Sequence, residues 1–279
     1  MNSEATVTEE EAREAVERRR PRSAVIFETI RQEGADELER AIPALFFSAL
    51  AAGLSMMFSL IASGTLRAAL PDAPWRPLIT AFGYAIGFLI VILGRQQLFT
   101  ENTLTPILPV LNDPKTWRIR ALGTLWLTVL AGNLVGALIA SAVVAFTPAF
   151  GEGPRAAFAA IARETVAPTF AALVAKGVIA GWIIALMVWL LPLADTFATV
   201  IILILTWLVS AAGLAHIIAG SVEAFYGAWS GATSWADYVH FAIPTLLGNI
   251  IGGVAFVAAV SSAEIAAERS QPGRRKRTF

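Results

Sequence analysis

The stretch GLAHIIAGSVEAFYGAW, residues 213–229, places ionisable groups directly after a segment suited to lipid. The preceding run TVIILILTWLV, residues 199–209, is almost entirely apolar, yet His216 and Glu223 follow within a few residues. An ionisable side chain at membrane depth costs about 2.5–3.5 kcal/mol even on a lenient insertion scale, and such groups usually face a cavity or a partner. The stretch therefore predicts a polar interior within a membrane protein.

The composition of the whole chain supports this interpretation. Hydrophobic residues make up 56% of the chain and charged residues 15%, whereas soluble domains carry about 25% charge. The formal net charge is zero, so bulk charge gives no indication of a nucleic-acid partner. The absence of cysteine excludes disulfides, thiolate metal sites and cysteine catalysis. No P-loop or zinc-protease pattern is present, so we expect neither an enzyme nor a bound cofactor or metal.

Apolar stretches long enough to cross a bilayer, which takes about 20 residues, recur along the chain. The second one ends in LGRQQLFTENTLTPILPVL, residues 93–111, where polar residues and two prolines interrupt the apolar pattern, and the fifth ends in the stretch at 213–229. We therefore expect an all-α polytopic membrane protein with six spans, of which the second and fifth are broken. The expected spans lie near residues 42–66, 77–99, 119–147, 168–191, 196–214 and 239–264.

A short internal repeat indicates two halves of three spans each. GNLVGALIASAVVAF in the third span matches GNIIGGVAFVAAV in the sixth, so Asn133 and Gly136 correspond to Asn249 and Gly252. Three spans per half imply an inverted repeat, and the two interrupted helices are then the middle spans. Paired interruptions of this kind indicate a transport site at the membrane midplane. The small residues predict close helix packing.

Charged segments flank the membrane part and predict its orientation. We expect a polar N-terminal segment at residues 1–40, a transmembrane domain at 41–265 and a basic tail at 266–279. The N-terminal segment has no early apolar core, so it does not read as a signal peptide. Lys and Arg cluster at both ends of the chain and in the connection NDPKTWRIR, residues 112–120. The positive-inside rule therefore predicts that both termini lie in the cytoplasm.

The two breaks carry the polar groups that chemistry requires. Lipid cannot satisfy the backbone groups that a broken helix leaves unpaired, so both breaks are expected to meet near the bundle axis. Thr100 and Asn102 offer a hydroxyl and an amide at one break, and His216 offers an imidazole at the other. The helical piece after each break is expected to direct N–H groups and a positive dipole end inward, which favours an anion.

Three segments carry a resemblance to a known family. LFTENTLT, AKGVIAGWIIALMVW and GLAHIIAGSVEAF resemble the signature regions of the formate/nitrite transporter family, in order and spacing, over residues 42–264. The versions GRQQLFTENTLTP and AHIIAGSVEAF are similar to its YfdC-like branch. The resemblance implies an aquaporin-like fold in the bacterial inner membrane and a homopentamer with one pore per protomer. It also implies a small anion such as formate or nitrite as substrate.

The resemblance implies roles for individual residues as well. Leu98, Phe99 and Thr100 match the break of the family's second span, and His216 matches its central pore histidine. Lys176 matches a lysine thought to attract anions, although a side chain that snorkels to the interface fits its position equally well. For His216 the alternative is a purely structural hydrogen bond.

A proton-assisted mechanism follows from physical chemistry. A small anion loses most of its hydration in an apolar constriction, at a large cost. A neutral weak acid crosses the same surroundings cheaply, so transfer of a proton to the anion removes the cost. Histidine titrates closest to neutral pH and is the natural donor or relay. We therefore expect protons to take part in permeation past His216.

Departures from the family pattern keep other functions open. Many members have a small residue where Arg95 stands and a glutamate where Gln97 stands, whereas this chain has Glu101 beyond the threonine and an added acid at Glu223. Arg95 is the candidate partner of Glu101 or Glu223, either in a structural ion pair or in a gate. One alternative is a non-conducting membrane scaffold or sensor with the same fold. Another is a pore for a neutral or cationic solute, lined by the two acids.

Overall fold

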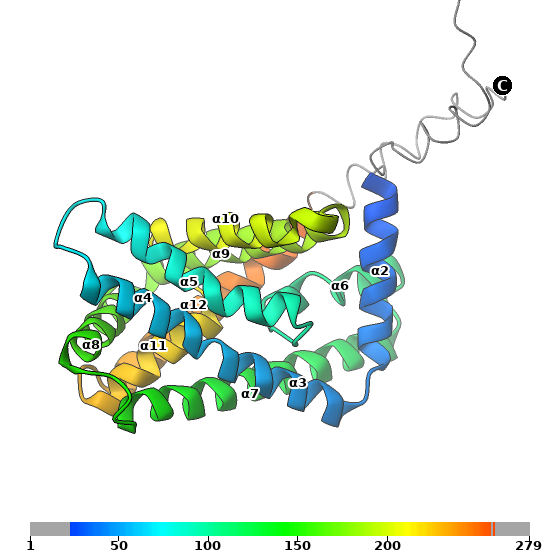
Figure 1. Cartoon of the computed structure of the whole chain (residues 1–279). Helices are drawn as coiled ribbons and strands as arrows, with labels where there is room; N and C mark the ends of the chain where they lie inside the picture. Colours follow the sequence, from blue (N-terminus) through cyan, green and yellow to red (C-terminus); the bar gives the residue numbers. More distant parts are fainter. Residues whose placement is uncertain (1–22, 258, 260–279) are drawn as a thin grey trace, which may run out of the picture.

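The computed structural model describes residues 23–257 and 259, and this part of the chain forms a helical bundle (Figure 1). The basic tail predicted at 266–279 and the first residues of the polar N-terminal segment lie outside the described residues. The helices are α2 (Ser23–Glu39), α3 (Ile42–Ser55), α4 (Met57–Ala69), α5 (Arg76–Leu93), α6 (Ile107–Asn112), α7 (Thr116–Phe146), α8 (Glu152–Val166), α9 (Phe170–Leu190), α10 (Ala198–Ala211), α11 (Ile217–Ser230) and α12 (Trp235–Val257).

Five helical segments of the described chain are long and apolar enough to cross a membrane. The first of them, Ile42–Ala69, consists of α3 and α4 with one turn residue, Met56, between them. The other four are α5, α7, α12 and a segment that extends α9 to Leu193. The shorter apolar helix α10 is the first part of the fifth span. The predicted all-α membrane fold is confirmed.

The predicted breaks in the second and fifth spans are also confirmed. After α5 the chain passes through an irregular segment and a 3₁₀ turn at Glu101–Thr103 before α6 begins. After α10 five residues separate the helix from α11. The helical pieces that follow differ in length: α6 has 6 residues and α11 has 14.

The close packing of corresponding helices confirms the inverted repeat. Helix α3 packs along α7 in the first half, and α9 packs along α12 in the second. A Cβ atom on Gly136 would lie 2.4 Å from the carbonyl oxygen of Leu50, and one on Gly252 would lie 2.0 Å from that of Val178. Both distances are far below van der Waals contact, so each glycine lets two helix backbones touch. Both halves therefore have a glycine at the equivalent position of this helix contact.

Two further helices cover the ends of the bundle. Figure 1 shows α2 across one end, beside α6, and α8 at the opposite end. Helix α2 buries Ile26 and Ile30 in a cluster with Leu104 and Leu108, so this part of the N-terminal segment is packed on the membrane domain. The sequence predicts no span between 119–147 and 168–191, and most of this connection forms α8.

Candidate functional site

Asn133 of α7 holds the backbone of the first break. Its side-chain oxygen accepts a hydrogen bond from the backbone N–H of Phe99 at 2.8 Å. Its amide nitrogen donates to the carbonyl oxygens of Gln97 and Ala49, also at 2.8 Å. The asparagine is fully buried. One side chain thus satisfies three backbone groups, two of them at the break, that neither lipid nor a helix could satisfy.

Asn249 of α12 does the same at the second break. Its oxygen accepts from the N–H of Ile217 at 2.8 Å, and its nitrogen donates to the carbonyls of Ala215 and Gly177 at 2.9 Å. The pattern of donors and acceptors repeats that of the first break. The repeat therefore pairs the segment 97–99 with 215–217, so that Leu98 and His216 occupy equivalent positions.

The two breaks meet at a hydrogen bond between Thr100 and His216. The Thr100 hydroxyl oxygen lies 2.7 Å from Nε2 of His216, and both residues are buried. Nδ1 of His216 accepts the backbone N–H of Ala219 at 3.2 Å, which caps α11. Because Nδ1 is an acceptor, a neutral ring carries its proton on Nε2 and donates it to Thr100. The Thr100 hydroxyl then keeps its own hydrogen for a third group.

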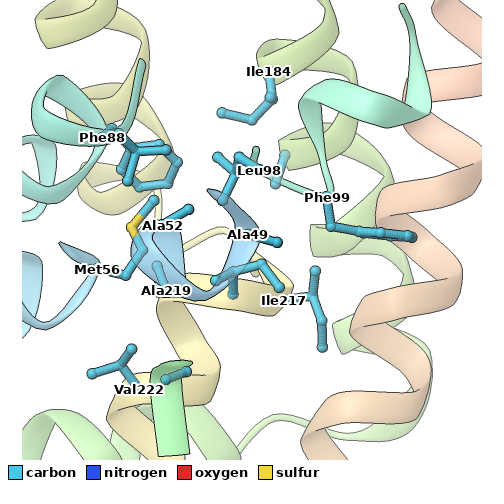
Figure 2. Close-up of a cluster of buried hydrophobic side chains, with 14 of the residues drawn as sticks. Ala49, Ala52, Met56, Phe88, Leu98, Phe99, Ile184, Ile217, Ala219 and Val222 are labelled. Atoms are coloured by element: carbon cyan, nitrogen blue, oxygen red, sulfur yellow. The ribbon is translucent and has the colours of Figure 1, made fainter. Parts of the chain in front are cut away.

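An apolar cluster surrounds this polar pair. Phe88 lies edge-on to the His216 ring, with 4.9 Å between the ring centroids. Leu98, Phe88 and Ile184 are each 0% exposed and belong to the main hydrophobic core. In Figure 2 Phe88 lies beside Met56, and Leu98 is drawn near Ile184. The centre of the bundle is therefore a buried apolar region with one hydrogen-bonded polar pair beside it.

A cavity of about 360 Å³ reaches His216 from the α8 end of the bundle. We call it the α8-side vestibule. Lys176 lines it, and a Cβ atom on Gly213 would lie 3.8 Å from the Lys176 ammonium nitrogen, so this charge sits beside the second break. The remaining charged residues that line this vestibule are Arg67, Arg76, Glu164 and Glu223.

Glu223 forms a hydrogen bond with helix α8 inside the α8-side vestibule. Its carboxylate accepts the hydroxyl of Thr165, a residue of α8, at 2.6 Å, and the side chain is 9% exposed. Nearby, Arg67 forms a two-pronged ion pair with Glu164 at 2.6 and 2.7 Å, which joins α4 to α8. Helix α8 therefore contributes two polar residues to the vestibule that the sequence interpretation did not identify.

A second cavity, of about 730 Å³, reaches the first break from the α2 end. We call it the α2-side vestibule. Gln97 and Asn102 lie at its inner end and are 8% and 4% exposed. The amide nitrogen of Asn102 donates to the side-chain oxygen of Gln97 at 2.8 Å and to the carbonyl of Leu98 at 3.1 Å. The charged residues that line this vestibule are Glu33, Asp36, Glu37, Arg40, Arg95 and Glu101.

The structure separates Glu223 from the other two charged residues considered for a gate. Arg95 and Glu101 line the α2-side vestibule, whereas Glu223 lines the α8-side vestibule. Within the described part of the chain, no ion pair joins Arg95 to either carboxylate. The geometry therefore places Arg95 and Glu223 on opposite sides of the apolar centre.

The expected dipole arrangement occurs at one break. Helix α11 begins at Ile217, directly beside His216, so its N-terminus lies at the centre. Two of its first N–H groups are already bonded, to Asn249 and to His216. At the first break a 3₁₀ turn begins at Glu101, directly after Thr100, and α6 begins only at Ile107. Sequence reasoning missed Phe88, which lies edge-on to His216, and Tyr84, which lines the α8-side vestibule. Both lie in an ordinary apolar run that gives no signal.

The geometry agrees with what comparisons of the sequence reveal. The profile of the family described as formate/nitrite transporter matches residues 24–263. The chain belongs to the formate/nitrite transporter family. The inner membrane protein YfdC of Escherichia coli strain K12 is 44% identical over 245 residues, which cover 88% of this chain and 79% of YfdC. The predicted family and its YfdC-like branch are thus confirmed.

Solved structures of the family share the fold. A structure described as an FNT family ion channel superposes with a TM-score of 0.74 and 20% identity, covering 85% of this chain and 97% of that one. A pentameric formate channel with formate bound gives a TM-score of 0.65 and 21% identity, covering 78% and 95%. At these identities the likeness establishes the channel fold.

Proposed function

We propose that this protein carries small monovalent anions, such as formate or nitrite, across the membrane with the assistance of a proton. The observation that carries the proposal is the Thr100–His216 pair, which joins the two halves at 2.7 Å inside an apolar centre. A hydroxyl and an imidazole in such a place can form hydrogen bonds with a small polar solute. The family and the formate channel of the same fold support this substrate class.

The hydrogen bonds suggest how proton transfer is coupled to the anion. The ring of His216 can take a proton on Nδ1 only by giving up the bond from Ala219, and loss of a cap costs about 0.5–2 kcal/mol. An anion beside the ring offsets this cost, because it stabilises the imidazolium. Solvent in the α8-side vestibule, which His216 lines, supplies the proton to Nδ1. The imidazolium then gives its Nε2 proton to the Thr100 oxygen while the Thr100 hydroxyl gives its own proton to the anion, and the ring keeps the Nδ1 proton. A neutral ring and a neutral weak acid result, and the acid crosses the apolar cluster cheaply.

The two vestibules fit a pathway with a collecting region at each end. Three cations and two carboxylates line the α8-side vestibule, and Lys176 lies beside the break there. Arg67 is paired with Glu164 and Arg76 with Asp72. Among the described residues Lys176 forms no ion pair, and its positive charge raises the local concentration of an anion. In the proposed orientation, with both termini in the cytoplasm of a bacterium, the α2-side vestibule opens to the cytoplasm and the α8-side vestibule to the periplasm. The relative YfdC is an inner membrane protein, which supports this location.

We propose a homopentamer in the lipid bilayer, with one pore in each protomer. The outer faces of the spans carry large exposed apolar side chains, such as Phe47, Leu127 and Phe146, which are 66–72% exposed. Such surfaces need lipid or neighbouring protomers to cover them. The formate channel of the same fold is pentameric.

Transport in proteoliposomes tests the function directly. We expect formate and nitrite flux above that of empty liposomes, rising as the pH falls. The variant His216→Asn keeps a residue type that caps helices well but cannot relay a proton, so its flux should be low and nearly independent of pH. An unchanged pH dependence in this variant would refute the proton relay. No flux of either anion from folded protein would favour a closed scaffold, whereas flux of neutral or cationic solutes alone would favour a different pore.

A further inference from the structure

Helices α5 and α10 end in the same backbone motif. At the end of α5, the N–H of Arg95 bonds to the carbonyl of Ile92 at 3.1 Å and the N–H of Gln96 bonds to that of Val91 at 2.9 Å. This pair of bonds is a Schellman motif, in which the residue after the cap adopts the left-handed conformation. That residue is Arg95, with φ of 52°.

The second break has glycine at the equivalent position. The N–H groups of Gly213 and Leu214 bond to the carbonyls of Ser210 and Val209, both at 2.9 Å, and Gly213 has φ of 59°. Glycine is the usual residue here because a Cβ atom makes the left-handed conformation unfavourable. In the described part of the chain, Arg95 is the one residue other than glycine with a positive φ.

No side-chain contact of Arg95 within the described residues compensates for this backbone strain. Its side chain is exposed and makes no hydrogen bond or ion pair with the residues that the structure describes. The guanidinium lines the α2-side vestibule. Arg40, the other cation of this vestibule, is paired with Glu37 at 3.2 Å. Arg95 therefore supplies the unpaired positive charge in a vestibule that also holds four carboxylates.

Gln97 offers a second, independent donor in the same vestibule. The amide nitrogen of Asn102 donates to the carbonyl of Leu98, which can only accept, so the orientation of Asn102 is fixed. The Gln97 atom that faces this nitrogen is then its oxygen, at 2.8 Å. The amide nitrogen of Gln97 has no hydrogen-bond partner among the described residues, although the side chain is 92% buried (8% exposed) and lines the cavity.

We propose that Arg95 and Gln97 form an anion-binding subsite in the α2-side vestibule, for a small monovalent oxyanion such as a carboxylate or nitrite. The guanidinium offsets part of the negative charge of the surrounding carboxylates and attracts the anion, and the buried amide N–H of Gln97 donates a hydrogen bond to it next to the apolar centre. Charged and amide donors together suit a planar oxyanion. This inference rests on the proposed function, because the anion that binds at the subsite is the one that the protein is proposed to transport.

Two substitutions at Arg95 separate the charge from the backbone strain. Arg95→Gly removes both, so it should raise the melting temperature in detergent. Arg95→Gln removes the charge and keeps the strain, so its melting temperature should stay near that of the wild type. Both variants should lower formate flux at low salt by about tenfold, as expected for loss of electrostatic attraction, and by less at high salt. Arg95→Lys keeps the positive charge, so its flux should be higher than that of the other two variants.

A second readout makes the subsite testable apart from transport. Sodium formate should raise the melting temperature of the wild type above that in sodium gluconate of equal ionic strength, since a ligand of the folded state stabilises it. This shift should be lost in Arg95→Gln and in Gln97→Glu, which keeps the bond from Asn102 but replaces the amide donor with a charge. Arg120→Gln, which removes an exposed arginine that lines neither vestibule, is the matched control and should keep the shift.

The outcomes are distinguishable. A formate-dependent shift that survives in both Arg95 variants overturns the subsite, as does unchanged flux in Arg95→Gly. Higher flux in Arg95→Gly would mean that the arginine obstructs the vestibule, which also overturns it. A wild type that carries no anion but shows the formate-dependent shift refutes the proposed transport and leaves the subsite supported.

Discussion

The two broken helices share one backbone plan but carry different side chains. Each ends in a Schellman motif, and each break is held by a buried asparagine through three hydrogen bonds. The equivalent positions are nevertheless occupied by different residues. The pairs are Arg95 and Gly213, Leu98 and His216, and Thr100 and Ile218. The repeat thus fixes where the chain bends, and the chemistry lies at the positions where the halves differ.

This comparison predicts that the asparagines are the most sensitive positions for folding. Replacing Asn249 with Ala leaves the N–H of Ile217 and the carbonyls of Ala215 and Gly177 unpaired in a buried place. Each unsatisfied group costs about 1–3 kcal/mol, so we expect the loss of about 3 kcal/mol or more of stability. Asn133→Ala should cost a similar amount. Thermal unfolding in detergent measures both.

Asn102 provides the contrast for these two variants. It is also buried, but its amide bonds one side chain and one carbonyl rather than three backbone groups. Asn102→Ala should therefore destabilise the protein less. A loss below about 1 kcal/mol for Asn133→Ala or Asn249→Ala would contradict the view that the two asparagines hold the breaks.

The next largest effect is expected from breaking the hydrogen bond between Thr100 and His216, which joins one half of the repeat to the other. Thr100→Val keeps the shape and removes the hydroxyl that bonds to His216 at 2.7 Å. A lost hydrogen bond of this kind is worth about 1.4 kcal/mol, or about tenfold in flux. We expect formate flux to fall by that factor and its pH dependence to weaken. Thr206→Val, which removes a buried hydroxyl that bonds to Ile202 of its own helix, should leave flux unchanged.

The backbone plan itself can be tested at Gly213. A Cβ atom there would meet nothing closer than the Lys176 ammonium at 3.8 Å, so Gly213→Ala adds no clash. The cost is that of the left-handed conformation alone, about 1–2 kcal/mol. The melting temperature should fall, opposite in sign to Arg95→Gly at the equivalent position. If both variants shifted it in the same direction, the two helix ends would not be equivalent.

Much of this arrangement could be predicted because it leaves a pattern in the sequence. Polar residues and glycines inside apolar runs mark the breaks, and the matched segments around Asn133 and Asn249 mark the repeat. The same patterns place Thr100 and His216 at the breaks. What they do not give is the partner of each asparagine, because Phe99 and Ile217 are far away along the chain.

Backbone conformation and connections were harder to predict. Glycine is the residue that most readily adopts the left-handed conformation. Gly94 nevertheless has φ of −76°, and its neighbour Arg95 adopts the left-handed conformation instead. Helix α8 was not predicted, because the segment is too short and too polar to read as a membrane span. Its buried residues, such as Phe158 and Ala162, are few. Its contribution to the α8-side vestibule depends on tertiary packing, which no local pattern encodes.

The smallest effect on formate flux is expected from removing the charge of Glu223 in the α8-side vestibule. Glu223→Gln keeps an oxygen to accept the Thr165 hydroxyl, so stability should hardly change. A unit charge about 10 Å from a hydrated anion contributes about 0.4 kcal/mol, so removing this carboxylate should raise formate flux about twofold. The gain should disappear at high salt, where the charge is screened. A large loss of flux would instead make Glu223 a required proton carrier, and the α8-side vestibule would then do more than collect the anion.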